Sequence, residues 1–241
     1  MKRTFIRFVK FSILSSFLLF VGCSPTQQIV KQTGVYSYNE PKGTKIDVTL
    51  GILVSSYSHQ TQTSFVQAGQ PQSVNEFASA FNKNFYDMMI DKGINTLGPF
   101  KNLDEMTFPE KKNSDLVVSP EINFVFSTAQ LSTQSKMNSV VYSYNISVGG
   151  SLDISILEPL SKERMWLKKL DLENLEKSMT FELKGSQNNA ANINTYTNNA
   201  YVDLLNIFFN TSFPTISKYF SAEELLVLKK QSQELREKKS Y

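Results

Sequence analysis

The order of apolar and polar positions predicts that the folded part of this chain opens with a strand. Every second residue from 46 to 54 is apolar, in the series Ile46, Val48, Leu50, Ile52 and Val54. Only the two-residue period of a β-strand explains this alternation, and such a strand buries one face. We therefore expect a folded domain over residues 46–241 and a different kind of segment before it.

The next segment predicts an amphipathic helix. Ser73 and Glu76 have the spacing of a capping box at a helix start, and Gly93 ends the pattern. The apolar residues between them recur at helical spacing: Val74, Phe77, Ala78, Phe81, Phe85 and Met88. We expect Phe81, in the middle of this face, to be buried. A strand near residues 94–97 and then a polar excursion are expected to follow.

Alternating apolar positions predict most of a sheet in the middle of the chain. They fall within residues 116–126, 140–156 and 165–183. Consecutive glycines at 149–150 interrupt the second of these segments, and glycines inside a strand pattern indicate a bulge or a sharp bend. Residues 158–163 have the composition of a hairpin loop, so the last segment should return across the sheet.

The C-terminal part predicts helices after a loop. Residues 185–199 are dominated by Asn, Ser, Gln and Thr, which bury too little apolar surface to favour order, so we expect a mobile loop. Helical spacing resumes at residues 201–208, and Pro214 is expected to kink or break that helix. A second capping box, Ser221 with Glu224, begins a final helix. The predicted fold is a single α+β domain with an antiparallel or mixed β-sheet and helices mainly on one face.

The first 22 residues are typical of a signal peptide. A basic start is followed by twelve uncharged residues, 11–22, which are too few for a membrane-spanning helix of about 20 residues. A retained membrane anchor is therefore the less favoured alternative. Gly22 and Cys23 resemble the lipobox at which lipoprotein signal peptidase cuts, although Phe20 stands where that motif usually has Leu. The other alternative is that Cys23 is an ordinary residue near an ordinary cleavage site.

Cysteine content favours lipidation, because Cys23 is the only cysteine and no intrachain disulfide is possible. The lipobox resemblance implies acyl chains on Cys23 that anchor the mature protein stably to a membrane. Ser24, in place of the Asp that causes inner-membrane retention, favours the outer membrane. Residues 23–45 are polar with scattered Pro and Gly, and we expect them to form a flexible tether with a span of roughly 25 Å.

Charge and composition exclude several functions. Cleavage removes four basic residues and leaves 21 basic against 22 acidic residues, a net charge of −1, so nucleic acid is not an expected partner. His59 is the only histidine and has no cysteine to join it in a metal site. Asp87 with Asp91, and Asp104 with Glu105, fit a solvated surface better than a catalytic carboxylate pair. There is no phosphate-binding glycine loop or nucleophile elbow, so we expect no cofactor and no enzyme activity.

The aromatic residues leave two interpretations open. Tyr142 and Tyr144 share one face of a predicted strand, and we expect Trp166 on a neighbouring strand. Stacked aromatic side chains on a sheet can bind a sugar, but more often they belong to the core, which is the interpretation we favour.

Four segments carry a resemblance to a known family: 21–25 around the cysteine, 156–161 in the hairpin, 205–208 in the late helix and 231–239 in the tail. In these segments the chain resembles the neuraminyllactose-binding hemagglutinin family, also called flagellar sheath adhesin, as a divergent paralogue. The resemblance implies a lipoprotein of the outer membrane, cell surface or flagellar sheath that binds a host glycan.

The segment to which that family owes its name differs here. In the family a short Lys/Arg-rich segment is proposed to bind sialylated sugars, and it would correspond to residues 130–136, where Lys136 is the one cation. Recognition of the sialic acid carboxylate is expected to use charge-assisted contacts, so no sugar-binding residue is carried over. We expect a surface or sheath lipoprotein with a binding or structural role. The alternative is a periplasm-facing lipoprotein that docks an envelope protein.

Overall fold

The structure is a computed structural model, and it describes residues 29–63 and 72–239 of the chain. Residues from Lys31 onward form one compact unit, and the residues up to Val30 form a separate one. The predicted signal peptide and both residues of the predicted cleavage site, Gly22 and Cys23, lie outside the described residues. Within the described residues, no helix combines the length and the apolar character needed to cross a membrane.

The compact unit contains elements in the order β1, β2, α1, β3, α2, β4, β5, β6, η1, α3 and α4, with the following bounds. The strands are β1 (Ile46–Leu53), β2 (Ser56–Thr63), β3 (Ile94–Phe100), β4 (Leu116–Lys136), β5 (Ser139–Leu157) and β6 (Arg164–Lys184). The helices are α1 (Gln72–Asp91), α2 (Phe108–Asn113), α3 (Ala190–Tyr219) and α4 (Ala222–Lys239), and a single 3-10 turn, η1 (Gly185–Gln187), precedes α3.

The strands form one mixed sheet with the order β3-β1-β4-β5-β6, and β2 also pairs with β4. The pairs of β1 with β3, β1 with β4 and β2 with β4 are parallel. Long antiparallel ladders join β4 to β5 and β5 to β6. The predicted α+β class with a mixed sheet in a single domain is therefore confirmed.

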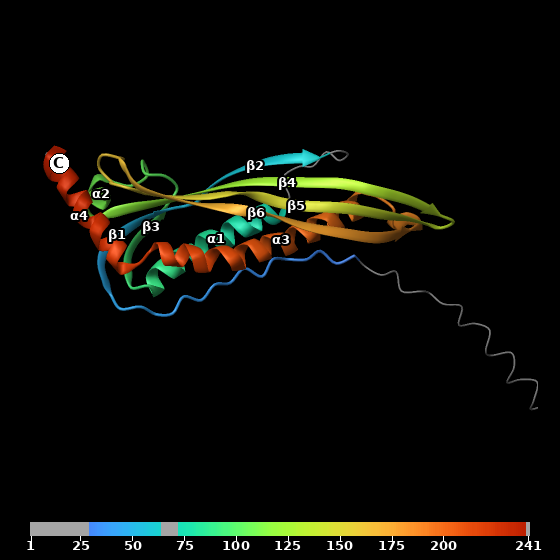
Figure 1. Cartoon of the computed structure of the whole chain (residues 1–241), viewed down its shortest axis with the longest axis horizontal. Helices are drawn as coiled ribbons and strands as arrows, with labels where there is room; N and C mark the ends of the chain where they lie inside the picture. Colours follow the sequence, from blue (N-terminus) through green and yellow to red (C-terminus); the bar gives the residue numbers. More distant parts are fainter. Residues whose placement is uncertain (1–28, 64–71, 240–241) are drawn as a thin grey trace, which may run out of the picture. The chain divides into compact units, whose positions relative to one another are not determined.

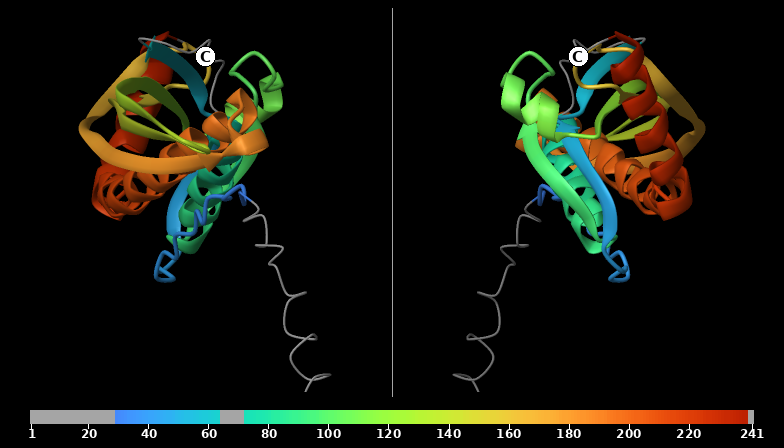
Figure 2. Two further views of the ribbon diagram at one scale, coloured as in Figure 1. Left: turned by 90° about the vertical axis from the view of Figure 1, so that its right-hand side faces the viewer. Right: turned by 90° about the vertical axis from the view of Figure 1, so that its left-hand side faces the viewer.

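Helices α1 and α3 cover one face of the sheet along its length (Figures 1 and 2). The core between them is aromatic: Phe77 of α1 meets Phe124 of β4 at 5.4 Å between ring centroids and Phe208 of α3 at 5.5 Å. Phe81 is fully buried and lies 5.3 Å from Phe213, as its place on the predicted helix face requires. Edge-to-face and tilted rings of this kind add to the burial of apolar surface.

The predicted irregularity at 149–150 is present in β5. The pairing of β5 with β6 shifts between Val148 and Gly150, where one extra residue of β6 is accommodated. Gly150 has φ of +134°, and a Cβ atom there would lie 1.8 Å from the carbonyl oxygen of Asn123. Only glycine allows β4 to approach this closely.

Residues 31–45 are packed on the helices, although their composition predicted a flexible tether. The backbone N–H groups of Val35 and Tyr38 donate to the side-chain oxygens of Asn206 in α3, at 3.0 Å, and Asn84 in α1, at 2.8 Å. The ring of Tyr36 lies 5.3 Å from that of Phe77. The tether prediction is wrong for this segment because amide side chains of the helices bind its backbone, which composition alone does not show.

Helix α3 begins before the point that the sequence predicted. The mobile loop expected over residues 185–199 is wrong, because α3 starts at Ala190 and Asn189 caps it by accepting from the N–H of Asn192 at 3.0 Å. Tyr196 stabilises this polar part by packing on the sheet. The helix also continues through Pro214, whose neighbours on either side are anchored in the core, so the predicted break is absent.

The two predicted capping boxes have different outcomes. The Ser73 box is wrong: this serine lies inside α1, and its hydroxyl has no hydrogen-bond partner among the described residues. At Ser221 the hydroxyl accepts from the N–H of Glu224 at 3.2 Å, as predicted. The carboxylate of Glu224 accepts instead from the indole N–H of Trp166, at 2.6 Å.

Candidate functional site

The two ends of the sheet differ sharply in charge. We call residues 127–148 and 178–202 the charge-poor end; its charged residues are Lys136, Glu182 and Lys184. We call α2, the 158–163 hairpin and α4 the charged end; α4 alone has nine charged residues among eighteen. The β4 ladder runs from Val117, paired with Leu157, to Lys136, paired with Ser139. At about 3.3 Å per residue this separates the ends by about 60 Å (Figure 1).

Four aromatic rings form a stack at the charge-poor end. Tyr142 and Tyr144 of β5 lie 5.7 and 5.8 Å from Phe181 on the neighbouring strand β6. Tyr196 of α3 covers Phe181 at 4.3 Å with its ring inclined by only 10°. Tyr144 and Phe181 are buried, which supports the core interpretation for them, whereas Tyr142 and Tyr196 are half-buried and reach the surface.

Neutral hydrogen bonds hold the stacked tyrosines in place. The hydroxyl of Tyr142 donates to Asn188 at 2.8 Å, and that of Tyr144 donates to Gln130 at 3.0 Å. Burial raises the pKa of the Tyr144 hydroxyl, with a smaller contribution from Tyr142, so the Tyr144 hydroxyl remains a donor at neutral pH. This end therefore offers aromatic edges, amides and hydroxyls, which suit a neutral polar surface better than a charged ligand.

Trp166 is on the strand next to β5, as predicted, but it does not join this stack. It pairs with Ile156 near the opposite end of the sheet and packs against Tyr219 and Phe220. Because β5 and β6 are each about 20 residues long, one strand can hold two aromatic groups many residues apart. Knowing that Trp166 is on the neighbouring strand therefore does not place it beside Tyr142 and Tyr144.

The one cation of the segment 130–136 is already paired. The ammonium of Lys136 lies 3.4 Å from the carboxylate of Glu182, which also accepts a hydrogen bond from Ser139. The Ser139 hydrogen bond, together with the charge of Lys136, lowers the pKa of Glu182, so that this carboxylate stays ionised. Lys111 and Lys112 are on α2, at the charged end. The structure therefore does not bring these three lysines together into an anion site.

A buried ion pair fastens α4 at the charged end. Glu158 is fully buried, and Arg236 donates to it through Nε at 2.7 Å. The same guanidinium donates to the carbonyl oxygens of Ser114, at 2.6 Å, and Lys112, at 3.2 Å. Burial disfavours the ionised form of Glu158, but hydrogen bonds from Ser161 and Arg236 outweigh it and hold the pKa below its usual value.

A second ionic contact lies about two turns earlier on α4. Lys229 donates to the backbone and carboxylate oxygens of Asp47 and lies 3.3 Å from the carboxylate of Asp115. Asp115 also accepts from the N–H of Thr49 at 2.8 Å. Burial alone would lower the pKa of Lys229, yet its two aspartate partners raise it. Arg236 and Lys229 are thus taken up by contacts within the protein.

The residues weighed as catalytic candidates do not converge. His59 is in β2, paired with Phe124 of β4, and Asp87 forms an exposed ion pair with Lys83 on the same helix at 2.7 Å. Asp104 pairs with Lys162 at the surface. Within residues 29–63 and 72–239, no group of three or more His, Cys, Asp or Glu side chains is placed to hold a metal ion. The expectation of no enzyme activity stays a prediction.

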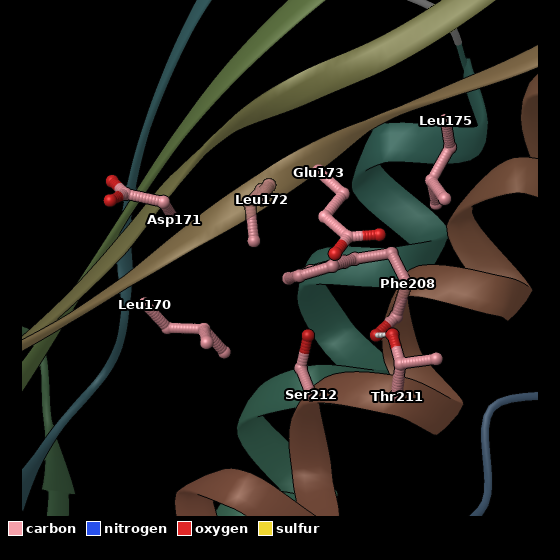
Figure 3. Close-up of a pocket in the computed structure, with 8 residues that line it drawn as sticks. All are labelled: Leu170, Asp171, Leu172, Glu173, Leu175, Phe208, Thr211 and Ser212. Carbon is pink, nitrogen blue, oxygen red and sulfur yellow. Dashed lines mark hydrogen bonds between the residues drawn. The ribbon is translucent and has the colours of Figure 1, made fainter.

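A cavity of about 310 Å³ lies between β6 and α3 (Figure 3). Its apolar lining comes from Leu170, Leu172 and Leu175 of the strand and Phe208 of the helix, whereas Asp171 points away from it. The hydroxyl of Thr211 at its rim is already bonded within α3. The cavity can hold a small apolar group, and it has no catalytic arrangement.

Sequence reasoning found Tyr142, Tyr144 and Lys136 but missed Phe181 and Tyr196 as members of the site. Phe181 was placed on the returning strand without a partner, and Tyr196 fell in the predicted loop. The signal that could have found Tyr196 is its spacing of four residues from Ala200, a helical spacing that puts both on one face of α3, where Ala200 is buried.

Comparison with known proteins supports a relation at the level of fold. No family model matches the sequence, and no curated protein matches it. Among solved structures, a Helicobacter pylori homologue of neuraminyllactose-binding hemagglutinin matches with a TM-score of 0.58 at 12% identity, over 81% of this chain and 97% of that one. This likeness shows a shared fold, and at this identity it does not show membership of that protein's family.

Two further structures match with lower scores. A Neisseria meningitidis lipoprotein has a TM-score of 0.27 at 10% identity, over 71% of this chain and 99% of that one. A Xanthomonas campestris protein of the DUF330 family has a TM-score of 0.30 at 11% identity, over 78% and 95% of the two chains. Of these three structures, the Helicobacter pylori one scores high enough to bear on the fold.

Proposed function

We propose that this protein is an outer-membrane lipoprotein, anchored by lipid on Cys23, with a binding or structural role rather than a catalytic one. The observation that carries the proposal is the position of Cys23. The only cysteine follows Gly22 at the end of a basic and then uncharged leader, eight residues before the compact unit begins at Lys31. Two or more acyl chains at this residue would give stable anchoring.

The shared fold supports an adhesin-type role at the cell surface or flagellar sheath. The Helicobacter pylori structure of the same fold is that of a hemagglutinin homologue. The described residues of this chain add no convergent set of nucleophile, base and oxyanion donors that would favour catalysis instead. The function is therefore proposed as contact with another surface or molecule.

Replacement of Cys23 tests the anchor. Cys23→Ser is expected to abolish acylation and to move the protein from the detergent phase to the aqueous phase in detergent phase separation. Ser24→Ala, which keeps the cysteine, is the matched control and should stay in the detergent phase. Mass spectrometry of the wild-type chain should show a lipidated N-terminus at residue 23. A Cys23→Ser protein that still partitions with membranes would refute the proposed anchor.

A host glycan remains a candidate ligand, but sialylated sugars are expected to bind weakly or not at all. The one cation of the relevant segment, Lys136, is paired with Glu182. Titration of sialyllactose against lactose at low salt, where exposed charge contacts are strongest, distinguishes the cases. A clear preference for the sialylated sugar that is lost in Lys136→Ala would restore sugar binding as the function.

The alternative is a periplasm-facing lipoprotein that docks an envelope protein. One feature of the charged end favours docking of a protein: Leu226 and Val227 are about half exposed among the charged residues of α4. Apolar groups within a polar rim are typical of protein interfaces. Protease treatment of intact cells, with immunogold labelling of intact and permeabilised cells, separates the two locations, because only a surface-exposed domain is cleaved and labelled without permeabilisation.

A further inference from the structure

The packing of residues 31–45 fixes where the chain enters the domain. Lys31 pairs with Glu76 near the start of α1 at 3.3 Å, and the N–H of Gln32 donates to Asn199 of α3 at 2.9 Å. Asn199 is the tenth residue of α3, so at 1.5 Å per residue it lies about 14 Å from the start of that helix. The entry point is therefore close to the charge-poor end.

The start of α3 is in turn attached to the end of the sheet. The N–H of Gly185 donates to the carbonyl of Asn138 in the β4–β5 turn at 3.1 Å, and Tyr142 donates to Asn188. In Figure 1 the segment after residue 29 runs along the helices, and the β4–β5 turn lies beyond the beginning of α3. The far end of α3, at Tyr219, packs on Trp166 next to the charged end.

The length of the linker limits how far the entry point can lie from a membrane. If Cys23 holds the lipid, eight residues connect it to Lys31, and they reach at most about 29 Å when fully extended. From Asn199 the helix continues for twenty residues, about 30 Å, before the charged end is reached, and the 158–163 hairpin lies farther on. A linker of this length keeps the entry point, and the charge-poor end beside it, within about 29 Å of the bilayer, whereas the charged end can lie farther away.

We propose that the charge-poor end rests on the lipid surface, with the β4–β5 turn as the point of contact. The inference rests on the proposed lipid anchor at Cys23. Met137 at the turn is 98% exposed, and Leu131, six residues before it on β4, is 62% exposed. The half-buried Tyr142 and Tyr196 stand behind them, and tyrosine is enriched where membranes meet water. These residues form a neutral amphipathic tip, which suits a lipid headgroup layer.

Charge distinguishes this tip from the other surface within reach. The helix-covered side of the domain carries the ion pairs Lys31–Glu76 and Lys83–Asp87. Desolvation of such charges opposes contact with a bilayer, whereas the tip has one ion pair, Lys136 with Glu182, and one further charged residue, Lys184. The contact is therefore expected on zwitterionic lipid and does not require anionic lipid.

This orientation reverses the expected role of the segment 130–136. The residues that the family resemblance aligned with a sugar-binding segment would face the protein's own membrane, and the charged end, with α2 and α4, would project away from it. A partner in solution or on another cell would then meet the charged end first.

A site-specific fluorophore tests the orientation on the full mature lipoprotein. Acylation blocks the thiol of Cys23, so a cysteine introduced elsewhere is the only reactive one. Met137→Cys at the tip and Phe108→Cys on α2, which is 68% exposed, form a matched pair of exposed apolar sites at opposite ends. Each labelled protein is reconstituted into phosphatidylcholine vesicles, with and without a lipid that carries a quencher in the bilayer.

The expected result is a blue shift and quenching of the label at position 137, with neither at position 108. Vesicle flotation measured on the same samples separates the two hypotheses. Proteins that float but show equal quenching at both sites, or more at position 108, would overturn the orientation while leaving the anchor intact. Proteins that do not float would refute the anchor and the orientation together. Both side chains are exposed, so neither substitution should disturb folding.

Discussion

The charged end and the charge-poor end solve the same structural problem with different chemistry. At both ends a helix must be fixed to a long sheet. At the charged end Arg236 and Lys229 of α4 are bound to carboxylates of the sheet region. At the charge-poor end Tyr196 of α3 is bound by ring stacking, and the neighbouring contacts are neutral hydrogen bonds. The ionic contacts of α4 should therefore depend on pH and salt, whereas the ring stacking of Tyr196 and the neutral hydrogen bonds beside it should not.

The largest loss of stability is expected in the aromatic core, which lies between the two ends. Phe81→Ala removes a fully buried ring between α1 and α3 and should lower the free energy of unfolding by about 3–5 kcal/mol, through lost transfer energy and a cavity. Urea and thermal unfolding of the lipid-free domain measure it. Lys83→Ala, on the exposed side of the same helix, is the control and should change little. An unchanged midpoint for Phe81→Ala would contradict the assigned core.

Removal of the buried cation sharpens the comparison at the charged end. Arg236→Ala leaves Glu158 buried without its partner and should cost about 3 kcal/mol, because an uncompensated buried charge is strongly unfavourable. Lys239 is in the same helix as Arg236 and forms an exposed ion pair with Glu163 of the hairpin. Lys239→Ala is therefore the matched control and should cost under about 1 kcal/mol. Equal losses for the two variants would show that the buried pair has no special weight.

Acid should loosen the charged end before the charge-poor end. The pKa of Glu158 is held below its unfolded value of about 4.3, so its contribution to stability is complete above that pH and is lost as the pH falls through the lower folded value. Glu158→Gln should therefore reduce the loss of stability between pH 6 and pH 3, measured by urea unfolding at each pH. The same pH dependence in wild type and variant would exclude Glu158 as its source.

The smallest effect is expected from the tyrosine hydroxyls. Tyr144→Phe removes one hydrogen bond to Gln130 from a buried ring and should cost about 1 kcal/mol. Tyr142→Phe, at a more exposed ring, should cost less. Both losses should be the same at low and high salt, unlike that of Arg236→Ala. A salt-dependent loss for Tyr144→Phe would remove the distinction between the two ends.

Elements with a strict apolar period were predictable from the sequence. The alternation from Ile46 gave β1, the helical spacing through Phe81 gave α1, and the glycines near 150 marked the bulge. Each of these buries one face against many neighbours, so packing and local pattern agree. The hairpin at 158–163 followed from the same logic, since its backbone closes with Glu158 N–H donating to the carbonyl of Glu163 at 2.9 Å.

Elements held by polar contacts were not predictable in this way. Strand β2 has almost no apolar residues and exists through its pairing with β4, and α2 is a short helix capped by Thr107 and Glu110. The packed segment 31–45 and Asn188, just before α3, depend on hydrogen bonds of asparagine side chains with partners more than 40 residues away in sequence. A segment rich in Asn, Ser and Thr can be a mobile loop or an ordered segment bound by distant side chains. Composition alone does not distinguish the two.

The same limit applies to the candidate site. The pattern placed Tyr142 and Tyr144 on one face of a strand, which the structure confirms, but it could not show that the neighbouring aromatic group is Phe181 rather than Trp166. Nor could the sequence show that Glu182, 46 residues away, neutralises Lys136. Register over long strands decides both contacts, and a single bulge changes it.

That bulge sets the phase of β6. Before it, Leu170 and Leu172 face α3 from even-numbered positions; after it, Leu175 and Phe181 face the same helix from odd-numbered positions. The extra residue of β6 opposite Gly149 thus changes which positions, even or odd, face the helix. Both halves of the strand therefore keep their apolar side chains on the same side of the sheet. Deletion of Asn174 would turn every later core residue of β6 outward at once. In evolution, the length of this strand is therefore more constrained at that point than the identity of any one of its surface residues.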